Sequence, residues 1–243
     1  MNPALEVEHL SFGYSKDNEA INDLSFSVPP GEVVGLIGPN GSGKSTLIRL
    51  IADLLKPRTG TIRVFDAPST SLAAKQDSIL LASNDYLPEF LTGLEYLRFI
   101  HGMYGLECRD EEVERQFFRY HMTGRWNDLI EDYSHGMRKK IQLVAALMVE
   151  RPLALIDETP NGIDVEALHT FEADIERMAS EGRSVLLCTH NLPLLERVAD
   201  SIMLLSRGAL TTFANTGDLV EHHGSISAFT RKVLMDHEDV ERE

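Results

Sequence analysis

A glycine-rich stretch near the N-terminus, "GPNGSGKST", constrains the fold of this chain more than any other feature. It follows the apolar run "EVVGLI" and opens a helical pattern, which is the strand, loop and helix order that the G-x4-G-K-[ST] motif requires. Its glycines let successive backbone N–H groups point at one anion, and the lysine adds a positive charge. The sequence therefore predicts a P-loop that holds a nucleoside triphosphate. The predicted nucleotide-binding residues of this loop are Gly38, Pro39, Asn40, Gly41, Ser42, Gly43, Lys44, Ser45 and Thr46.

Alternating strand and helix patterns place the P-loop in an α/β core. Amphipathic patterns predict helices at 44–56, with Leu47 to Leu54 on its apolar face, and at 165–180. The first strands have no helices between them, whereas the later ones alternate with helices. We therefore predict a P-loop NTPase core with a mainly parallel sheet and an N-terminal antiparallel β subdomain. Strands are predicted at 4–10, 21–28, 32–38, 61–66, 78–83, 153–157, 184–189 and 201–206.

A long stretch without strand patterns interrupts the core. Between the strands predicted at 78–83 and 153–157, the patterns are helical, which predicts an inserted α-helical subdomain at approximately 85–150. The whole chain, 1–243, is predicted to form one domain. Its acidic end, approximately 236–243, is predicted to be a solvated or frayed tail.

Composition excludes several classes of protein. A formal net charge of −15 argues against a nucleic-acid partner, because DNA binding depends on Lys and Arg at the phosphates. No apolar run approaches the roughly 20 residues of a membrane-spanning helix, and the first residues do not form a signal peptide. Cys108 and Cys188 have no CxxC spacing and suit a reducing compartment. We therefore expect a cytoplasmic protein without a cysteine metal site.

Acidic and histidine residues follow two further strand patterns. The strand in "RPLALIDETP" ends at Asp157 and Glu158; beside a P-loop, Asp157 would hold Mg²⁺ with Ser45, and Glu158 would orient the attacking water. The strand in "LLCTHN" ends near His190, which would lie at the same end of the sheet and hydrogen-bond the γ-phosphate. The alternative for His190 is an ordinary histidine satisfied in the core or at its edge.

The stretch "YSHGMRKK" allows two interpretations. Ser134 is a predicted N-cap, and Gly136 leaves backbone N–H groups uncovered, so the stretch can be simply the start of a helix. Alternatively, the bare N-terminus of this helix holds an anion. No phosphate site lies near it in the sequence, so that anion would have to come from elsewhere.

The order of "GPNGSGKST", "YSHGM", "LALIDE" and "TH" resembles that of the ATP-binding cassette (ABC) ATPase family over essentially the whole chain. The resemblance implies a head-to-tail dimer with a second ABC ATPase subunit, identical or different. It also implies that the signature sequence of each subunit closes over the nucleotide on the partner's P-loop. Here the implied signature residues are Ser134, His135, Gly136 and Met137.

The same resemblance assigns three more residues. Asp164 in "PNGID" matches the D-loop aspartate, and His190 matches the switch histidine. Tyr14 in "FGYS" stands where the family has an aromatic ring that stacks on adenine, which implies ATP as the nucleotide. An ordinary strand aromatic is the alternative for Tyr14.

The chain also departs from the family pattern. His135 replaces a glycine and Met137 a glutamine, a variant that resembles the ATPases of two-component exporters, including drug-resistance systems. The Q-loop glutamine is absent, and its position falls at Ser83, with Asn84 beside it. A shorter side chain there would bring metal and attacking water into register less well.

The resulting prediction is an ATPase with ATP and Mg²⁺ as its cofactors, which drives a separate transmembrane permease and lies at the inner face of the cell membrane through that permease. One alternative is a soluble ABC protein acting on DNA or the ribosome, and another is a nucleotide-gated subunit with weak hydrolysis. The predicted permease-binding segment carries the aromatic residues Tyr86, Phe90, Tyr96, Phe99 and Tyr104.

Overall fold

The computed structural model describes residues 2–15, 18–82, 86–158 and 162–239, and only the backbone of residues 236–239. Its centre is a six-stranded sheet in which neighbouring strands are parallel except for the last pair, β9 and β10. The prediction of a mainly parallel sheet is therefore confirmed. In spatial order the strands are β10 (Ala209–Asn215), β9 (Ser201–Ser206), β3 (Val33–Ile37), β8 (Ser184–Cys188), β7 (Leu153–Asp157) and β6 (Ser78–Leu81).

The parallel strands are buried on both faces. Alternate side chains of a strand point to opposite faces, and in β3 Val33 and Ile37 pack into one hydrophobic core while Val34 and Leu36 pack into the other. This explains why these strands read as continuous apolar runs in the sequence. The sheet holds the loop after β3 and the acidic end of β7 in fixed relation to each other.

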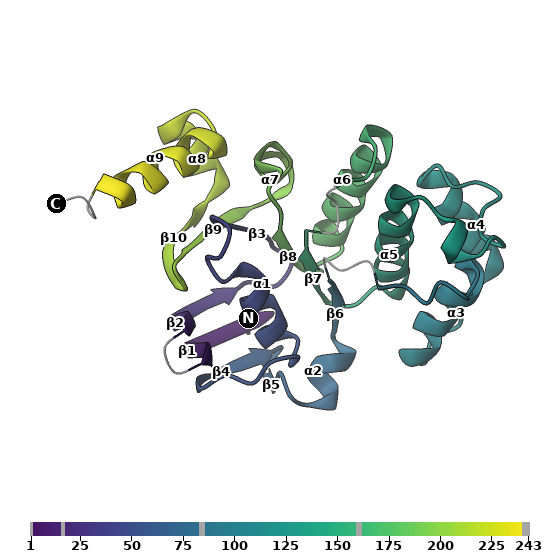
Figure 1. Ribbon diagram of the computed structural model, residues 1–243, viewed down its shortest axis with the longest axis horizontal. Coiled ribbons are helices and arrows are strands. Elements are labelled where there is room, and N and C mark those ends of the chain that lie inside the picture. Colours follow the sequence, from purple (N-terminus) through teal and green to yellow (C-terminus); the bar gives the residue numbers. More distant parts are fainter. Residues whose placement is uncertain (1, 16–17, 83–85, 159–161, 240–243) are drawn as a thin grey trace.

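A second, antiparallel sheet forms the predicted N-terminal β subdomain and lies below the central sheet in Figure 1. Its long first two strands pair as a hairpin, and the second packs near β10. The short last strand was not predicted. In spatial order the strands are β2 (Asn18–Val28), β1 (Leu5–Ser15), β4 (Thr59–Val64) and β5 (Ala67–Pro68).

In the described residues, six helices accompany the two sheets. The helix predicted at 165–180 is confirmed, but the helix predicted at 44–56 was too long, because Asp53 adopts a left-handed backbone (φ 57°) just beyond Ile51. Leu54 is consequently exposed rather than on a buried helix face. The tail is helical through Asp239, and residues 240–243 lie outside the described part. The helices are α1 (Lys44–Ile51), α2 (Leu72–Gln76), α6 (Val165–Ser180), α7 (Leu192–Val198), α8 (Thr216–His223) and α9 (Ile226–Asp239).

Between β6 and β7 the regular elements of the described residues are helices, which gather at the right of Figure 1. They are α3 (Gly93–Met103), α4 (Asp110–Arg119), the 3-10 helix η1 (Ile130–Asp132) and α5 (His135–Val149). The longest of them, α5, packs against both α3 and α6 and so joins this helical part to the core. Across the described ranges, no helix has the length and apolar character needed to span a membrane.

Candidate functional site

The loop between β3 and α1 is the predicted P-loop. The Nζ atom of Lys44 donates hydrogen bonds to the carbonyl oxygens of Gly38 and Pro39, each at 2.9 Å. The Lys44 side chain is buried by this arrangement. The loop therefore encircles its own ammonium group, and that group lies at the start of α1, where backbone N–H groups and the helix dipole also favour an anion.

Two glycines of this loop are required by close contacts. At Gly43 (φ 104°) a Cβ atom would lie 2.6 Å from the Ala20 carbonyl oxygen, and at Gly38 it would lie 2.1 Å from that of Leu205. Both distances are too short for any side chain. The N-cap position Gly43 makes no side-chain capping bond, so the first N–H groups of α1 stay available to a ligand.

A hollow of about 310 Å³ opens beside the loop. Its wall includes Asn40 and Gly41, whereas Ser42 is almost fully buried and its Oγ makes no hydrogen bond within the described residues. Residues 18–20 of β2 also line the hollow, and the sequence analysis missed them because nothing in their own pattern points to a ligand. The lining residues are Tyr14, Asn18, Glu19, Ala20, Asn40, Gly41, Gly43, Lys44, Ser45, Thr46 and Glu158.

The predicted metal ligands lie beside each other. The Oγ atom of Ser45 donates a hydrogen bond to Oδ1 of Asp157 at 3.1 Å, and Asp157 is buried at the end of β7. A hydroxyl and a carboxylate are oxygen ligands of the kind that Mg²⁺ prefers, with phosphate and water completing its shell. No group of three or more His, Cys, Asp or Glu side chains in the described residues forms a metal cluster. The pair fits Mg²⁺ that arrives with a triphosphate.

Glu158 and His190 also meet. Glu158 has a left-handed backbone (φ 54°), and its N–H donates to the Cys188 carbonyl oxygen at 2.9 Å. Its Oε1 atom lies 2.9 Å from Nε2 of His190. Burial and the nearby Asp157 raise the pKa of the Cys188 thiol, which therefore stays neutral beside these carboxylates. The structure thus brings an acceptor for a water proton and an imidazole together at one end of the sheet.

Tyr14 stands at the edge of the same hollow. Its hydroxyl is 3.1 Å from Oγ1 of Thr46, and its ring packs edge-on against Phe12 with the centroids 5.0 Å apart. The side chain is nevertheless 56% exposed. These contacts hold the ring next to the P-loop while leaving much of its surface open for stacking.

The signature stretch lies apart from this hollow. Ser134 caps α5, with its Oγ atom accepting a hydrogen bond from the Met137 backbone N–H at 3.3 Å, while His135 begins the helix. Gly136 lies close to Gly162, whose carbonyl oxygen would be 3.4 Å from an added Cβ. Among the described residues, none of 134–137 lines the P-loop hollow. The start of α5 and the P-loop hollow are therefore separate places on the described chain.

Asp164 caps α6 and forms an ion pair with a lysine of α5. It caps α6 by accepting from the Ala167 N–H at 2.9 Å, and its Oδ2 atom lies 2.5 Å from Nζ of the buried Lys140. Partial burial opposes the charge of Asp164, but the Lys140 hydrogen bond and charge lower its pKa overall. Sequence analysis missed Lys140, which lies six residues beyond Ser134. Ser83 and Asn84, at the predicted Q-loop position, lie outside the described residues.

Comparisons with known proteins agree on one family. The family model described as "ABC transporter" matches residues 21–161. The chain is 31% identical over 86% of its length to the uncharacterized ABC transporter ATP-binding protein YdbJ of Bacillus subtilis, of which the match covers 68%. It is 32% identical over 91% of its length to the daunorubicin/doxorubicin resistance ATP-binding protein DrrA of Streptomyces peucetius, of which 68% is covered. A solved ATP-binding subunit of an ABC transporter superposes with a TM-score of 0.82 at 32% identity, over 91% of this chain and 93% of that one.

Proposed function

The chain belongs to the ABC transporter family of ATP-hydrolysing subunits, and from this premise we propose that it dimerises head to tail around ATP and drives export through a separate membrane permease. Export is favoured by relatives whose names include drug resistance, Nod factor export and SkfA peptide export. In this arrangement the subunit lies at the cytoplasmic face of the membrane, held there by the permease.

The proposed mechanism assigns roles to the P-loop and to the residues beside it. The loop N–H groups and Lys44 hold the triphosphate, and Tyr14 stacks on the adenine ring. Mg²⁺, held by Ser45 and Asp157, would neutralise charge on the phosphate oxygens. Glu158 accepts a proton from the attacking water, and His190, now 2.9 Å from that carboxylate, keeps it oriented and donates to the γ-phosphate.

The observation that carries the dimer proposal is the separation of the two half-sites. The Ser134 end of α5 exposes N–H groups suited to an anion, yet none of the described residues 134–137 reaches the P-loop hollow of the same chain. A second subunit can supply the missing γ-phosphate in a head-to-tail pair. Asp164 and Lys140 support this geometry, since their ion pair fixes the start of α6 against α5.

The permease-binding surface is proposed on α3 and the segment before it. Tyr86, Phe90 and Phe99 are exposed there, which is unusual for large aromatic rings and suits a protein partner. Tyr104 and Tyr96 differ: both are partly buried, and burial raises the pKa of Tyr96 to about 12. The three exposed rings are therefore the proposed contact.

The weak-hydrolysis alternative remains distinct from this proposal. It rests on Ser83 and Asn84, which stand where the family has a glutamine. Basal turnover of the isolated chain, measured by phosphate release, separates the two. Sustained hydrolysis that depends on Mg²⁺ supports the transporter ATPase, and binding without hydrolysis supports a nucleotide-gated subunit.

Removing the Tyr14 ring is expected to weaken ATP binding. We predict that Tyr14→Ala costs roughly 1–3 kcal/mol, the range for losing one stacked base, and narrows the preference for ATP over GTP. Calorimetric titration with each nucleotide measures both effects. Tyr14→Phe keeps the ring and should retain affinity, and Phe118→Ala, which removes an exposed ring on α4, should change nothing. Equal wild-type affinities for ATP and GTP would contradict the stacking role.

The experiment that tests the dimer proposal mixes two defective chains. One carries Lys44→Ala, and the other carries Ser134→Arg, whose bulk blocks the signature half-site. If the P-loop of each chain meets the signature of the other, one nucleotide site of the mixed dimer contains both substitutions. The other site contains neither and stays intact. With Glu158→Gln added to both chains, an intact site appears as one tightly held ATP per dimer. We expect that result, with no ATP retained by either pure variant.

The chain offers a matched control for Ser134→Arg. Ser71 is also a serine N-cap, which accepts a hydrogen bond from the Ala74 N–H at 3.2 Å at the start of α2. Ser71→Arg therefore removes a similar cap and adds the same bulk away from the proposed interface. Chains with Ser71→Arg should retain ATP in both sites. A mixed dimer, purified through two different tags, that holds no ATP would overturn the assignment of Ser134 to the partner's nucleotide.

A further inference from the structure

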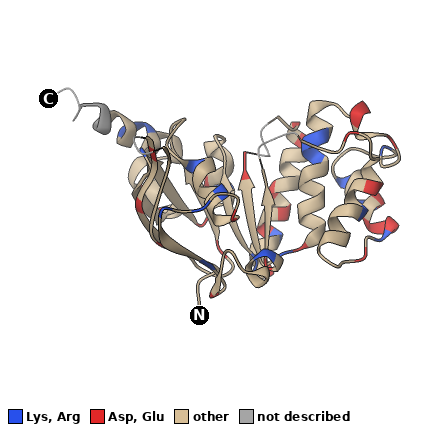
Figure 2. Cartoon of the chain, turned by 60° about the horizontal axis from the view of Figure 1, so that its bottom comes forward, with Lys and Arg blue, Asp and Glu red and all other residues tan. Residues whose placement is uncertain are grey.

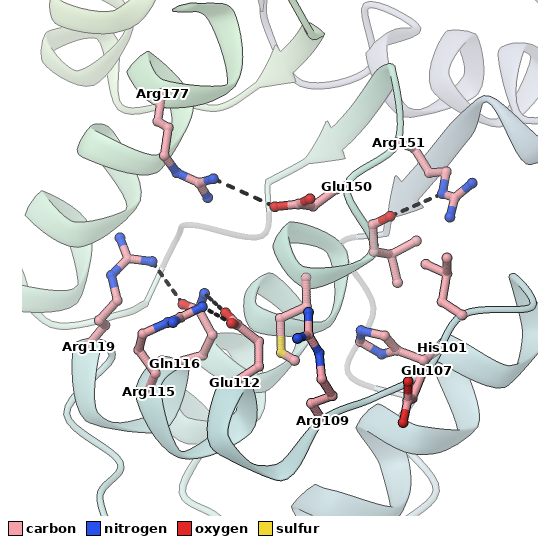
Figure 3. Close-up of a pocket in the computed structure, with 13 residues that line it drawn as sticks. His101, Glu107, Arg109, Glu112, Arg115, Gln116, Arg119, Glu150, Arg151 and Arg177 are labelled. Carbon is pink, nitrogen blue, oxygen red and sulfur yellow. Dashed lines mark hydrogen bonds and ion pairs between the residues drawn. The ribbon is translucent and has the colours of Figure 1, made fainter. Parts of the chain in front are cut away.

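A second hollow lies away from the P-loop site. It has a volume of about 770 Å³ and is drawn in Figure 3. Its walls come from the end of α3, the segment that leads into α4, α4 itself, the end of α5 and one side chain of α6. Elements distant in the sequence therefore converge on it, and none of the residues assigned to the nucleotide lines it.

This hollow lies at the opposite end of β7 from the nucleotide site. Glu150 and Arg151 line it and come just before Leu153, where β7 begins, whereas Asp157 ends that strand. A rise of about 3.3 Å per residue separates the two ends of β7 by about 13 Å. A ligand in the hollow would therefore not touch the P-loop or its carboxylates.

Arginine side chains are concentrated in this hollow. The chain has 23 lysine and arginine residues and a formal net charge of −15, yet five arginines line this single surface. They come from the start of α4 and its later turns, from the end of α5 and from α6, as Figure 3 shows, while charges of both signs are spread over the neighbouring helices in Figure 2. The five are Arg109, Arg115, Arg119, Arg151 and Arg177.

Three of these arginines already have carboxylate partners. Arg115 pairs with Glu112 one turn earlier on α4. Arg119 donates to the fully buried Asp174 at 2.6 Å. Arg177 lies 3.4 Å from Asp174 and 3.7 Å from Glu150. Most of their charge is therefore compensated within the protein.

The other two arginines have no carboxylate partner within the described residues. Arg109 makes no side-chain hydrogen bond or ion pair there and points into the hollow in Figure 3. Arg151 donates only to the carbonyl oxygens of Val149 at 3.1 Å and Gln76 at 3.3 Å, with its guanidinium 4.9 Å above the Tyr104 ring. These contacts hold the Arg151 side chain in place without neutralising its charge, so little further ordering would be needed for it to bind an anion.

The remaining carboxylate of the lining, Glu107, has no ion pair in the described structure. Within the described residues the lining therefore has two guanidinium groups without a carboxylate partner and one carboxylate without an ion pair, which leaves an excess of positive charge. Guanidinium groups bind phosphate through paired, charge-assisted hydrogen bonds. The volume of about 770 Å³ leaves room for a group attached to that phosphate.

From these observations we infer that the hollow is a second anion site, in which Arg109 and Arg151 hold a small phosphate-bearing anion. The phosphate belongs either to a soluble ester or to the headgroup of an anionic lipid. This site is independent of the proposed dimer and of ATP hydrolysis, and its test does not rely on either.

Pyrophosphate is the soluble probe, titrated calorimetrically into chains that all carry Lys44→Ala to weaken the P-loop site. Any residual P-loop binding is the same in every chain compared. Because each guanidinium makes charge-assisted hydrogen bonds, Arg109→Gln and Arg151→Gln should each weaken binding about 10–100-fold. Arg125→Gln is the matched control: it removes an arginine of the helical part that pairs with Asp128 and does not line the hollow, and it should leave affinity unchanged.

The lipid source is tested by cosedimentation with phosphatidylcholine vesicles with and without phosphatidylglycerol. If Arg109→Gln abolishes binding to the anionic vesicles and the chain does not bind pyrophosphate, the site is assigned to a lipid headgroup. If pyrophosphate binding depends on Arg109 and vesicle binding is not seen, the site is assigned to a soluble ester. Arg151→Gln could disturb the backbone it supports, but Arg109 is exposed and unpaired, so its variant decides the test. If neither probe shows binding that depends on Arg109, the inference is overturned.

Discussion

ATP hydrolysis by a Glu158→Gln variant is expected to be about 10²–10⁴-fold slower than in the wild type, while ATP binding stays intact. The amide keeps the shape of the side chain and its place beside His190, where Oε1 and Nε2 are now 2.9 Å apart. It cannot accept the proton of the attacking water. Phosphate release measures the loss of hydrolysis, and equilibrium titration with ATP measures the preserved binding.

The control for this variant is Glu176→Gln, which removes a carboxylate from an exposed position on α6 away from the nucleotide. It should hydrolyse ATP at the wild-type rate. If Glu158→Gln also kept that rate, the proton acceptor would have to be another group, and the proposed mechanism would be wrong in its central step. Unchanged thermal unfolding of Glu158→Gln would show that the lost activity does not come from a less stable fold.

A Lys44→Ala variant should fail at an earlier step, because it binds ATP weakly. The Lys44 side chain is buried, and its ammonium donates to the Gly38 and Pro39 carbonyl oxygens of the P-loop. Losing charge-assisted hydrogen bonds to the phosphates costs about 1.5–3 kcal/mol, which weakens ATP affinity roughly 10–100-fold. Titration with ATP and Mg²⁺ measures the change directly.

Lys56→Ala is the matched control for the loss of charge. Lys56 lies five residues beyond the end of α1 and is exposed, so its removal should leave ATP affinity as it is. Equal ATP affinity in the Lys44→Ala and Lys56→Ala variants would remove the P-loop assignment. Lower affinity in both would point to a general electrostatic effect instead.

Local patterns in the sequence predicted those parts of the fold that local physics determines. Helix α6 begins and ends where its pattern does, because Asp164 caps it and its apolar positions keep a helical period. Helix α1 was predicted too long because the apolar spacing continues to Leu54. The left-handed Asp53 ends the helix first, and apolar spacing alone does not reveal that backbone change.

The edge strand β10 escaped prediction for a related reason. Its residues alternate between exposed and half-buried, and "ALTTFAN" carries little apolar signal of its own. The strand forms because it pairs antiparallel with β9, and its own sequence does not predict this pairing. The turn that leads into it lies against β2, where a Cβ atom at Gly208 would be 2.6 Å from the Ala20 carbonyl oxygen.

The P-loop and the carboxylates of the candidate nucleotide site could be predicted because they follow strands that end at the same edge of one sheet, whereas residues 18–20 come from the other sheet and were missed. The arginine hollow could not be predicted, because residues from 101 to 177 reach it from four helices and two connecting segments. Each of those arginines reads in the sequence as an ordinary surface charge. Only the packing of α4 against the ends of α5 and α6 brings them together.

Helix α5 runs from the Ser134 end, which the dimer proposal assigns to the partner's nucleotide, to the arginine hollow. Ser134 caps one end, and Val149 at the other end borders the arginine hollow. Its 15 residues span about 22 Å, a distance over which a packed helix tilts or slides as one body. A tilt of α5 that moves Ser134 therefore also moves Val149 at the border of the hollow. If anions at the two ends are coupled through such a tilt, thermodynamic reciprocity requires that each changes the affinity for the other by the same factor.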